Sequence, residues 1–163
     1  QELDDIRRAV TDVDRVRTFY IGWLDPLMCE GHWVPEMIEI AGGVELVGEA
    51  GEYGVEVDWE RVRELAPEMV FVAPCSFDLQ KTRSEIDVLE RLPGWAHTPA
   101  ALRDRVFAAD SGFFSTPGPR IVPGTRMFAR ALHPERFPQT IDSGLLAKRR
   151  TGVSGAVEWL DYA

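Results

Sequence analysis

The sequence has few cysteines, no long apolar run and too little positive charge for a nucleic-acid-binding protein. Its two cysteines, Cys29 and Cys75, are too few for a disulfide-rich scaffold, and the sequence does not say whether they form one bridge. The chain contains no pair of CxxC motifs and no HExxH motif, so we predict no metal site.

The longest apolar stretches fall well short of the ~20 residues that cross a bilayer, so no segment is expected to span a membrane. The formal net charge is −9, which argues against nucleic acid as a partner because phosphate binding needs a basic surface. The acidity is explained by solubility, or by docking onto a basic surface of a partner protein.

The chain is long enough for one domain, with 163 residues of which 45% are hydrophobic. It has neither an initiating Met nor a signal peptide, and it opens on QELDDIRRAV. Leu3, Ile6 and Val10 have helical spacing, so we interpret this opening as the end of a helix in a longer protein.

Strands and helices are expected to alternate along the chain. The predicted strands are 16–23, 69–73 and 106–110, and the predicted helices are 35–41, 59–65, 78–92, 99–103 and 120–132. The alternation predicts the α/β class, as a three-layer α/β/α lobe with a mostly parallel sheet of about four or five strands. The tail after residue 137 is interrupted by glycines, and only Val157, Trp159 and Leu160 look buried in it.

Ligands of parallel α/β sheets bind beyond the carboxyl ends of the strands. The segments that follow those ends are 23–26, 74–77 and 110–114, and they contain aromatic and small polar residues without a cluster of titratable groups. This composition favours holding a large flat ligand over proton transfer.

Three stretches of the chain, in order, resemble the C-terminal lobe of cobalamin-binding members of the periplasmic-binding-protein family. They are WLDP…GHWVPEMIEIAGG, VDWERVRELAPEMVFVAPCSFD and RVFAADSGFFSTPGPRIVPGTRMFARALHPE. The resemblance covers roughly residues 10–137, and the order of the motifs is more specific than any one of them.

The resemblance implies a solute-binding lobe of an ABC importer, without catalysis and without a cofactor. Residues 1–10 would end the helix that joins two lobes, residues 11–137 would form the C-terminal lobe, and residues 138–163 would be an extension of unknown role. The ligand would be a corrinoid such as cobalamin, or haem or a siderophore. The expected partners are the membrane subunits of the transporter and an N-terminal lobe absent from this chain, in a periplasmic or extracytoplasmic location.

The candidate ligand-binding residues come from the strand ends, the glycine-bearing loop and the start of two helices. They are Trp23, Asp25, His32, Trp33, Tyr53, Cys75, Phe77, Phe113, Phe114 and Arg120. Aromatic faces would stack on a conjugated macrocycle, and His32 would donate a hydrogen bond or coordinate cobalt or iron.

Each of these residues also has an ordinary structural role. Trp23 and Asp25 suit core packing and a turn, His32 and Tyr53 suit an exposed turn, and Cys75 suits a small buried thiol. Because adjacent aromatics in one loop do not easily both enter the core, at least one of Phe113 and Phe114 is expected to face the ligand. Arg120 opens a helix, where its charge opposes the dipole, so it would fix the loop or meet a ligand carboxylate.

Glu60, in Val57-Asp58-Trp59-Glu60, matches the position at which cobalamin-binding relatives offer a glutamate to arginines of the membrane subunits. Its ordinary role would be to complement the dipole of a helix capped by Asp58.

Two alternatives to solute binding stay open. One is an α/β enzyme that uses Cys75 or His32, although no third group positions a base in the sequence. The other is an interaction domain that binds no ligand.

Overall fold

Four strands of the described sheet run parallel to one another. In the computed structural model, which describes residues 1–139, 141–152 and 154–162, these strands are β1 (Val16–Leu24), β3 (Gly43–Glu45), β4 (Met69–Val72) and β5 (Val106–Ala109). β1 pairs in parallel with β3 and β4, and β4 with β5. Every residue of β4 and β5 is buried, as expected for strands covered on both faces.

Antiparallel strands extend this sheet at both edges. β2 (Leu27–Cys29) folds back on β1, and β6 (Leu146–Thr151) with β7 (Val157–Asp161) forms a hairpin beside β5. Within the described residues the sheet therefore has seven strands, in the order β2-β1-β4-β5-β6-β7 with β3 on β1. The parallel centre confirms the predicted fold class, whereas the expected four or five strands were too few.

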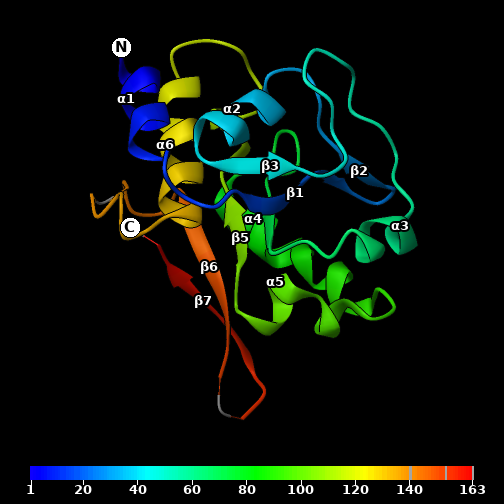
Figure 1. Cartoon of the computed structure of the whole chain (residues 1–163). Coiled ribbons are helices and arrows are strands. Elements are labelled where there is room, and N and C mark those ends of the chain that lie inside the picture. The colour runs from blue at the N-terminus through cyan, green and yellow to red at the C-terminus, as the bar shows by residue number, and fades with distance from the viewer. Residues whose placement is uncertain (140, 153, 163) are drawn as a thin grey trace.

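The sequence did not predict the short strands β2 and β3 or the β6–β7 hairpin, and the hairpin is the largest of these differences. It projects away from the body of the lobe in Figure 1, and most of β7 is exposed. Val157 and Leu160 are 37% and 40% exposed, so the expectation that they are buried was wrong. A projecting hairpin needs few apolar residues, which explains why its hydrophobic pattern is weak.

Helices cover both faces of the sheet and give three layers (Figure 1). One face carries α1 (Glu2–Ala9), α2 (Val34–Ile40) and α6 (Ile121–Leu132). The other face carries α3 (Trp59–Glu64), α4 (Leu79–Glu85), α5 (Pro99–Leu102) and the 3-10 turns Ile86–Arg91 and Trp95–His97. The predicted helix 78–92 is thus an α-helix that continues as a 3-10 helix.

Side-chain caps begin α3 and α4, and the cap of α3 was predicted from the sequence. The carboxylate of Asp58 accepts a hydrogen bond from the Glu60 N–H at 3.0 Å, and that of Asp78 accepts one from the Lys81 N–H at 2.8 Å. A carboxylate at this position satisfies an N–H group that has no partner within the helix. These caps place α3 and α4 directly after the loops that lead from the sheet.

A cluster of aromatic rings fills the core between the sheet and the α6 face. The ring centroid of Phe71 lies 4.5 Å from that of Phe128 and 5.2 Å from that of Phe114. Tyr20 stacks on the same ring at 6.0 Å, and all four side chains are at most 1% exposed. Phe71 is therefore at the centre of this aromatic cluster, where its ring packs against the other three.

Candidate functional site

The carboxyl ends of β1, β4 and β5 meet at one edge of the sheet, as the parallel pairing requires. A pocket of about 260 Å³ opens there, which we call the His32 pocket. Its lining residues are Glu30, His32, Trp33, Val34, Cys75, Phe114 and Ser115. His32, Trp33, Cys75 and Phe114 were predicted from the sequence, whereas Glu30 and Ser115 were not.

His32 joins the end of β2 to the loop of residues 48–54. Its backbone N–H donates to the carbonyl oxygen of Glu52 at 2.6 Å, and its own carbonyl accepts from the Gly51 N–H at 2.7 Å. The residue has φ 52°, a left-handed conformation that is uncommon for a residue with a side chain. The two bonds hold this conformation in place.

The His32 ring belongs to a short row of aromatic rings. It stacks on Trp33 with centroids 5.4 Å apart and meets Tyr53 edge-on at 5.1 Å. Tyr53 is 81% exposed, so its ring is available to a ligand or partner. The indole N–H of Trp33 donates to the carbonyl of Phe114 at 2.7 Å, which ties this row to the loop after β5.

Glycines allow the 48–54 loop to pack directly on the segment after β2. A Cβ added to Gly48 would lie 1.9 Å from the carbonyl oxygen of Glu30, and one added to Gly31 would lie 2.2 Å from that of Glu52. Both neighbours are backbone atoms, which cannot turn aside as a side chain can. Glycine is required at these positions by close approach.

Replacement of Gly48 by alanine is therefore expected to destabilise the fold by about 1–3 kcal/mol, the usual cost of forcing extra volume into a packed site. The measurement is the free energy of unfolding from a urea titration. Gly152→Ala is the matched control, because its Cβ would meet the nearest atom, Ala156 O, at 3.4 Å. Equal losses in the two variants would contradict the packing argument.

The Glu45 side chain holds the start of the same loop against β1. One carboxylate oxygen accepts from the Tyr20 N–H at 3.0 Å, and the other accepts from the Val47 N–H at 3.2 Å and the Gly48 N–H at 3.3 Å. Burial raises the pKa of Glu45 from 4.5 to about 8, and the backbone donors oppose that shift. The carboxyl group thus links the loop to β1 and titrates near neutral pH.

The raised pKa makes the stability of the fold depend on pH. The favourable contribution of protonated Glu45 is fully present below pH 4.5 and is lost as the pH rises towards about 8. We expect the urea midpoint to fall over this window and the fall to be smaller in Glu45→Gln. Part of the slope remains in both proteins, because burial also raises the pKa of Glu30. An identical slope in the variant would contradict this assignment.

Trp23 and Phe77 form a second aromatic group at the same edge. Their ring centroids are 5.5 Å apart, and Lys81 Nζ lies 4.3 Å from the centroid of Phe77. The indole N–H of Trp23 donates to the carbonyl of Asp25 at 3.0 Å, and the Trp23 residue is 37% exposed. Asp25 is exposed and precedes a cis proline in the turn between β1 and β2. Trp23 is thus neither a core residue nor fully exposed.

Cys75 is exposed, so its interpretation as a small buried thiol was wrong. It follows β4 after Pro74, where the chain leaves the sheet and the side chains turn outwards. Cys75 and His32, on which the enzymatic alternative depends, line the same pocket. Among the residues that the structure describes, the Cys75 sulfur forms a side-chain hydrogen bond only with the hydroxyl of Ser76, at 3.8 Å, and no base is hydrogen-bonded to it.

The side chains of Phe113 and Phe114 lie in different parts of the lobe. Phe114 is 1% exposed and packs on Tyr20, Phe71 and Phe128, so its ring belongs to the core and is not free to stack on a ligand. Phe113 is partly buried, and the guanidinium carbon of Arg120 lies 5.8 Å from its ring centroid. Adjacent residues separate in this way because the 3-10 turn Ser111–Phe113 ends between them.

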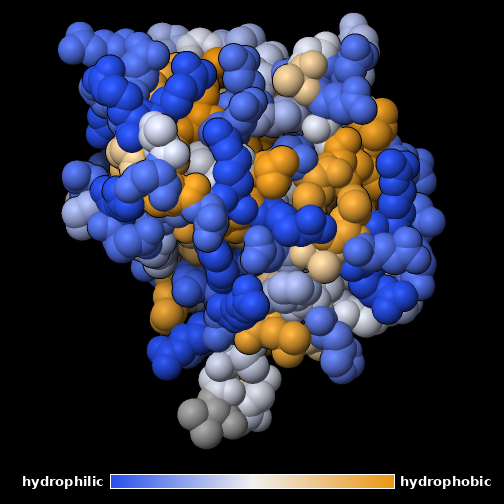
Figure 2. All heavy atoms as spheres, viewed as in Figure 1, coloured by the Kyte–Doolittle hydropathy of each residue, from blue (hydrophilic) through white to orange (hydrophobic). Residues whose placement is uncertain are grey.

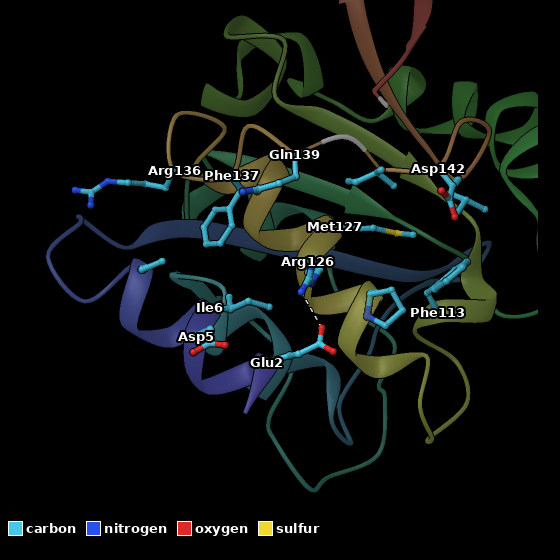
Figure 3. Close-up of a pocket in the computed structure, with 14 residues that line it drawn as sticks. Glu2, Asp5, Ile6, Phe113, Arg126, Met127, Arg136, Phe137, Gln139 and Asp142 are labelled. Atoms are coloured by element: carbon cyan, nitrogen blue, oxygen red, sulfur yellow. Dashed lines mark hydrogen bonds and ion pairs between the residues drawn. The ribbon is translucent and has the colours of Figure 1, made fainter.

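Phe113 lines a different cavity, of about 440 Å³, between α1, α6 and the segment that follows α6 (Figure 3). Its floor includes Ile6 and Met127, and Arg126 pairs with Glu2 across it at 2.8 Å. Phe113 is the one predicted residue among those that line this cavity within the described chain. The predicted site residues are therefore not all brought together.

Glu60 lies in the first turn of α3, and its side chain is about half exposed. Its carboxylate pairs with Arg63 one turn later on the same helix. An exposed pair of this kind is weak and can exchange for another arginine. The role of Glu60 in docking stays a prediction.

The surface gives no sign of one broad apolar face in the view of Figure 2, where hydrophobic residues emerge as separate patches between hydrophilic ones. Several of the exposed large apolar residues come from β1, β3 and the loop after β3: Trp23, Val44, Tyr53 and Val55. Across the described residues, no helix is long and apolar enough to cross a bilayer, and no group of acidic, histidine and cysteine side chains is arranged to hold a metal ion.

A three-layer lobe with a pocket at the carboxyl ends of parallel strands is the architecture of a ligand-binding α/β lobe. A family model described as periplasmic binding protein matches residues 1–112. The chain therefore belongs to the periplasmic binding protein family. A search of curated proteins found no match.

Solved structures share this fold at low sequence identity. A periplasmic heme-binding protein from Pseudomonas aeruginosa is 23% identical over 93% of this chain and 55% of its own, with a TM-score of 0.69. The periplasmic vitamin B12 binding protein BtuF of Vibrio cholerae is 21% identical over 85% and 52%, with a TM-score of 0.62. The molybdate-binding protein MolA of Haemophilus influenzae is 23% identical over 84% and 42%, with a TM-score of 0.67. The chain spans about half the length of these proteins.

Proposed function

We propose that this chain is one lobe of the substrate-binding protein of an ABC importer, located in the periplasm or on the outer side of the membrane. The ligand we propose is a corrinoid such as cobalamin, or a related tetrapyrrole or siderophore complex. The role in substrate binding is supported by membership of the periplasmic binding protein family. The ligand class is supported by relatives whose names record vitamin B12 or heme.

The single observation that carries the proposal is the aromatic row at the mouth of the His32 pocket. His32, Trp33 and Tyr53 lie in ring contact at the edge where ligands of parallel sheets bind. Aromatic faces stack on a flat conjugated ligand, and an imidazole is a ligand for cobalt or iron. Such a surface would bind a ligand without changing it chemically.

The proposal gives α1 the role of the helix that joins two lobes, with a second lobe closing over the carboxyl edge. A ligand held between two lobes loses about half of its contact area when one lobe is absent. We therefore expect this chain alone to bind a corrinoid weakly or not at all, and the two-lobed protein to bind it tightly. Tight binding by the chain alone would mean that the site lies elsewhere.

The test is a titration of the two-lobed protein with cyanocobalamin, dicyanocobinamide, haemin and a ferric siderophore, followed by absorbance. One of these chelates is expected to bind, and His32→Ala is expected to weaken it. If His32 coordinates the metal, the same change also alters the absorbance spectrum of the complex. Failure of all four chelates to bind would overturn the proposal.

A further inference from the structure

Glu30 places a carboxylate in the wall of the His32 pocket. It follows β2 directly and lies over Gly22, where the β1–β2 pairing changes register. A Cβ added to Gly22 would meet the Glu30 Cγ and Oε1 at 2.4 Å, and one added to Gly54 would meet Oε2 at 3.5 Å. The carboxylate is thus held between two backbone segments that have no side chain to cover it.

Within residues 1–139, 141–152 and 154–162, the Glu30 carboxylate has no partner of opposite charge. Among the described residues, no arginine, lysine or histidine nitrogen lies within 4.0 Å of it, and no donor forms a hydrogen bond to it. Burial raises the pKa of Glu30, and the nearby imidazole of His32 opposes that shift. Within the described chain, the Glu30 oxygens therefore stay open to solvent and can accept hydrogen bonds from a ligand.

The surroundings of Glu30 are acidic. The 48–54 loop adds the exposed carboxylates of Glu49 and Glu52. Two cations near this edge lie outside the lining of the His32 pocket. Lys81 lies against Phe77, and Arg120 lies against Phe113. An anionic ligand group would therefore meet repulsion at the His32 pocket, whereas a donor or a cation would be attracted.

We infer that the His32 pocket receives a ligand group that donates hydrogen bonds or carries positive charge, such as a carboxamide, and that Glu30 accepts from it. This inference rests on the proposed function and narrows its ligand class. It favours an amide-bearing corrinoid over a porphyrin with carboxylate side chains or a small oxyanion. Glu30 is then a residue that determines specificity.

The test compares cyanocobalamin, which carries carboxamides, with haemin, which carries carboxylates, on the two-lobed protein. Wild type is expected to prefer cyanocobalamin, and Glu30→Gln is expected to weaken that ligand at least about tenfold, as for loss of a hydrogen bond to a charged group. Glu30→Asp, which keeps the charge on a shorter stem, is expected to give a smaller loss. Glu64→Gln, at an exposed residue of α3 that does not line the pocket, is the matched control and is expected to bind as wild type does.

Thermal melting of each variant separates a binding effect from a folding defect. Unchanged cyanocobalamin affinity in a folded Glu30→Gln protein would overturn the inference and leave the proposed function intact. Preference of wild type for haemin would do the same. Binding of neither ligand, nor of any other metal chelate, by wild type would overturn the proposed function and the inference with it.

Discussion

Glu60→Arg is expected to nearly abolish uptake by the transporter while ligand affinity and fold stay unchanged. The carboxylate is exposed on α3, and the capped first turn holds its backbone in place. A guanidinium of the partner can bind a carboxylate through two parallel hydrogen bonds, which fixes orientation as well as attraction. The substitution would replace this match by repulsion between like charges.

The measurement is ligand uptake into vesicles that contain the membrane subunits, with ligand affinity measured in parallel. Glu60→Gln is expected to slow uptake without stopping it, because the amide keeps the shape and loses the charge. Glu64→Arg is the matched control, since it makes the same charge change on an exposed residue of the same helix. Normal uptake with Glu60→Arg would end the docking hypothesis.

Phe71→Ala is expected to destabilise the chain by about 3–5 kcal/mol, the range for truncation of a buried aromatic side chain. Phe71 is fully buried, and its ring contacts those of Tyr20, Phe107, Phe114 and Phe128. A loss of this size is a large part of the roughly 5–15 kcal/mol that stabilises a typical domain. Much of the variant protein should therefore be unfolded at moderate urea concentrations.

The measurement is a urea titration followed by tryptophan fluorescence and circular dichroism. Leu102→Ala is the control, because Leu102 is 68% exposed and its truncation should change stability by no more than about 0.5 kcal/mol. A loss below about 1.5 kcal/mol for Phe71→Ala would show that the aromatic cluster repacks around the missing ring.

Sequence patterns located the elements near the centre of the lobe more reliably than those at its margin. The runs at β4 and β5 are continuous in apolar residues because helices cover both faces, and β1 is rich in β-branched and aromatic residues, so each leaves a local signal. The hairpin of β6 and β7 has charged residues on both strands and forms through pairing with β5. Pairing between distant segments leaves no periodic pattern in the chain.

The candidate site was predicted in part. The sequence predicted a site at the strand ends, because parallel strands bring their carboxyl ends to one edge. His32, Trp33 and Cys75 do line one pocket there. The same reasoning did not separate Phe113 from Phe114, which face different cavities. It also passed over Glu30, because a single glutamate between a strand and a glycine looks like an ordinary surface residue.

By itself, the sequence determined the α/β class, the central strands, the cap at Asp58, and the order of motifs that resembles the periplasmic binding proteins. All of these follow from local chemistry: runs of apolar residues, side chains that cap a helix, and glycines that permit close approach. Only the tertiary structure decided that Phe114 is buried, that Cys75 is exposed and that the Glu30 carboxylate lies beside His32 with no ion-pair partner among the described residues. Burial and charge pairing depend on which distant segments come together, and that is set by the packing of the whole lobe.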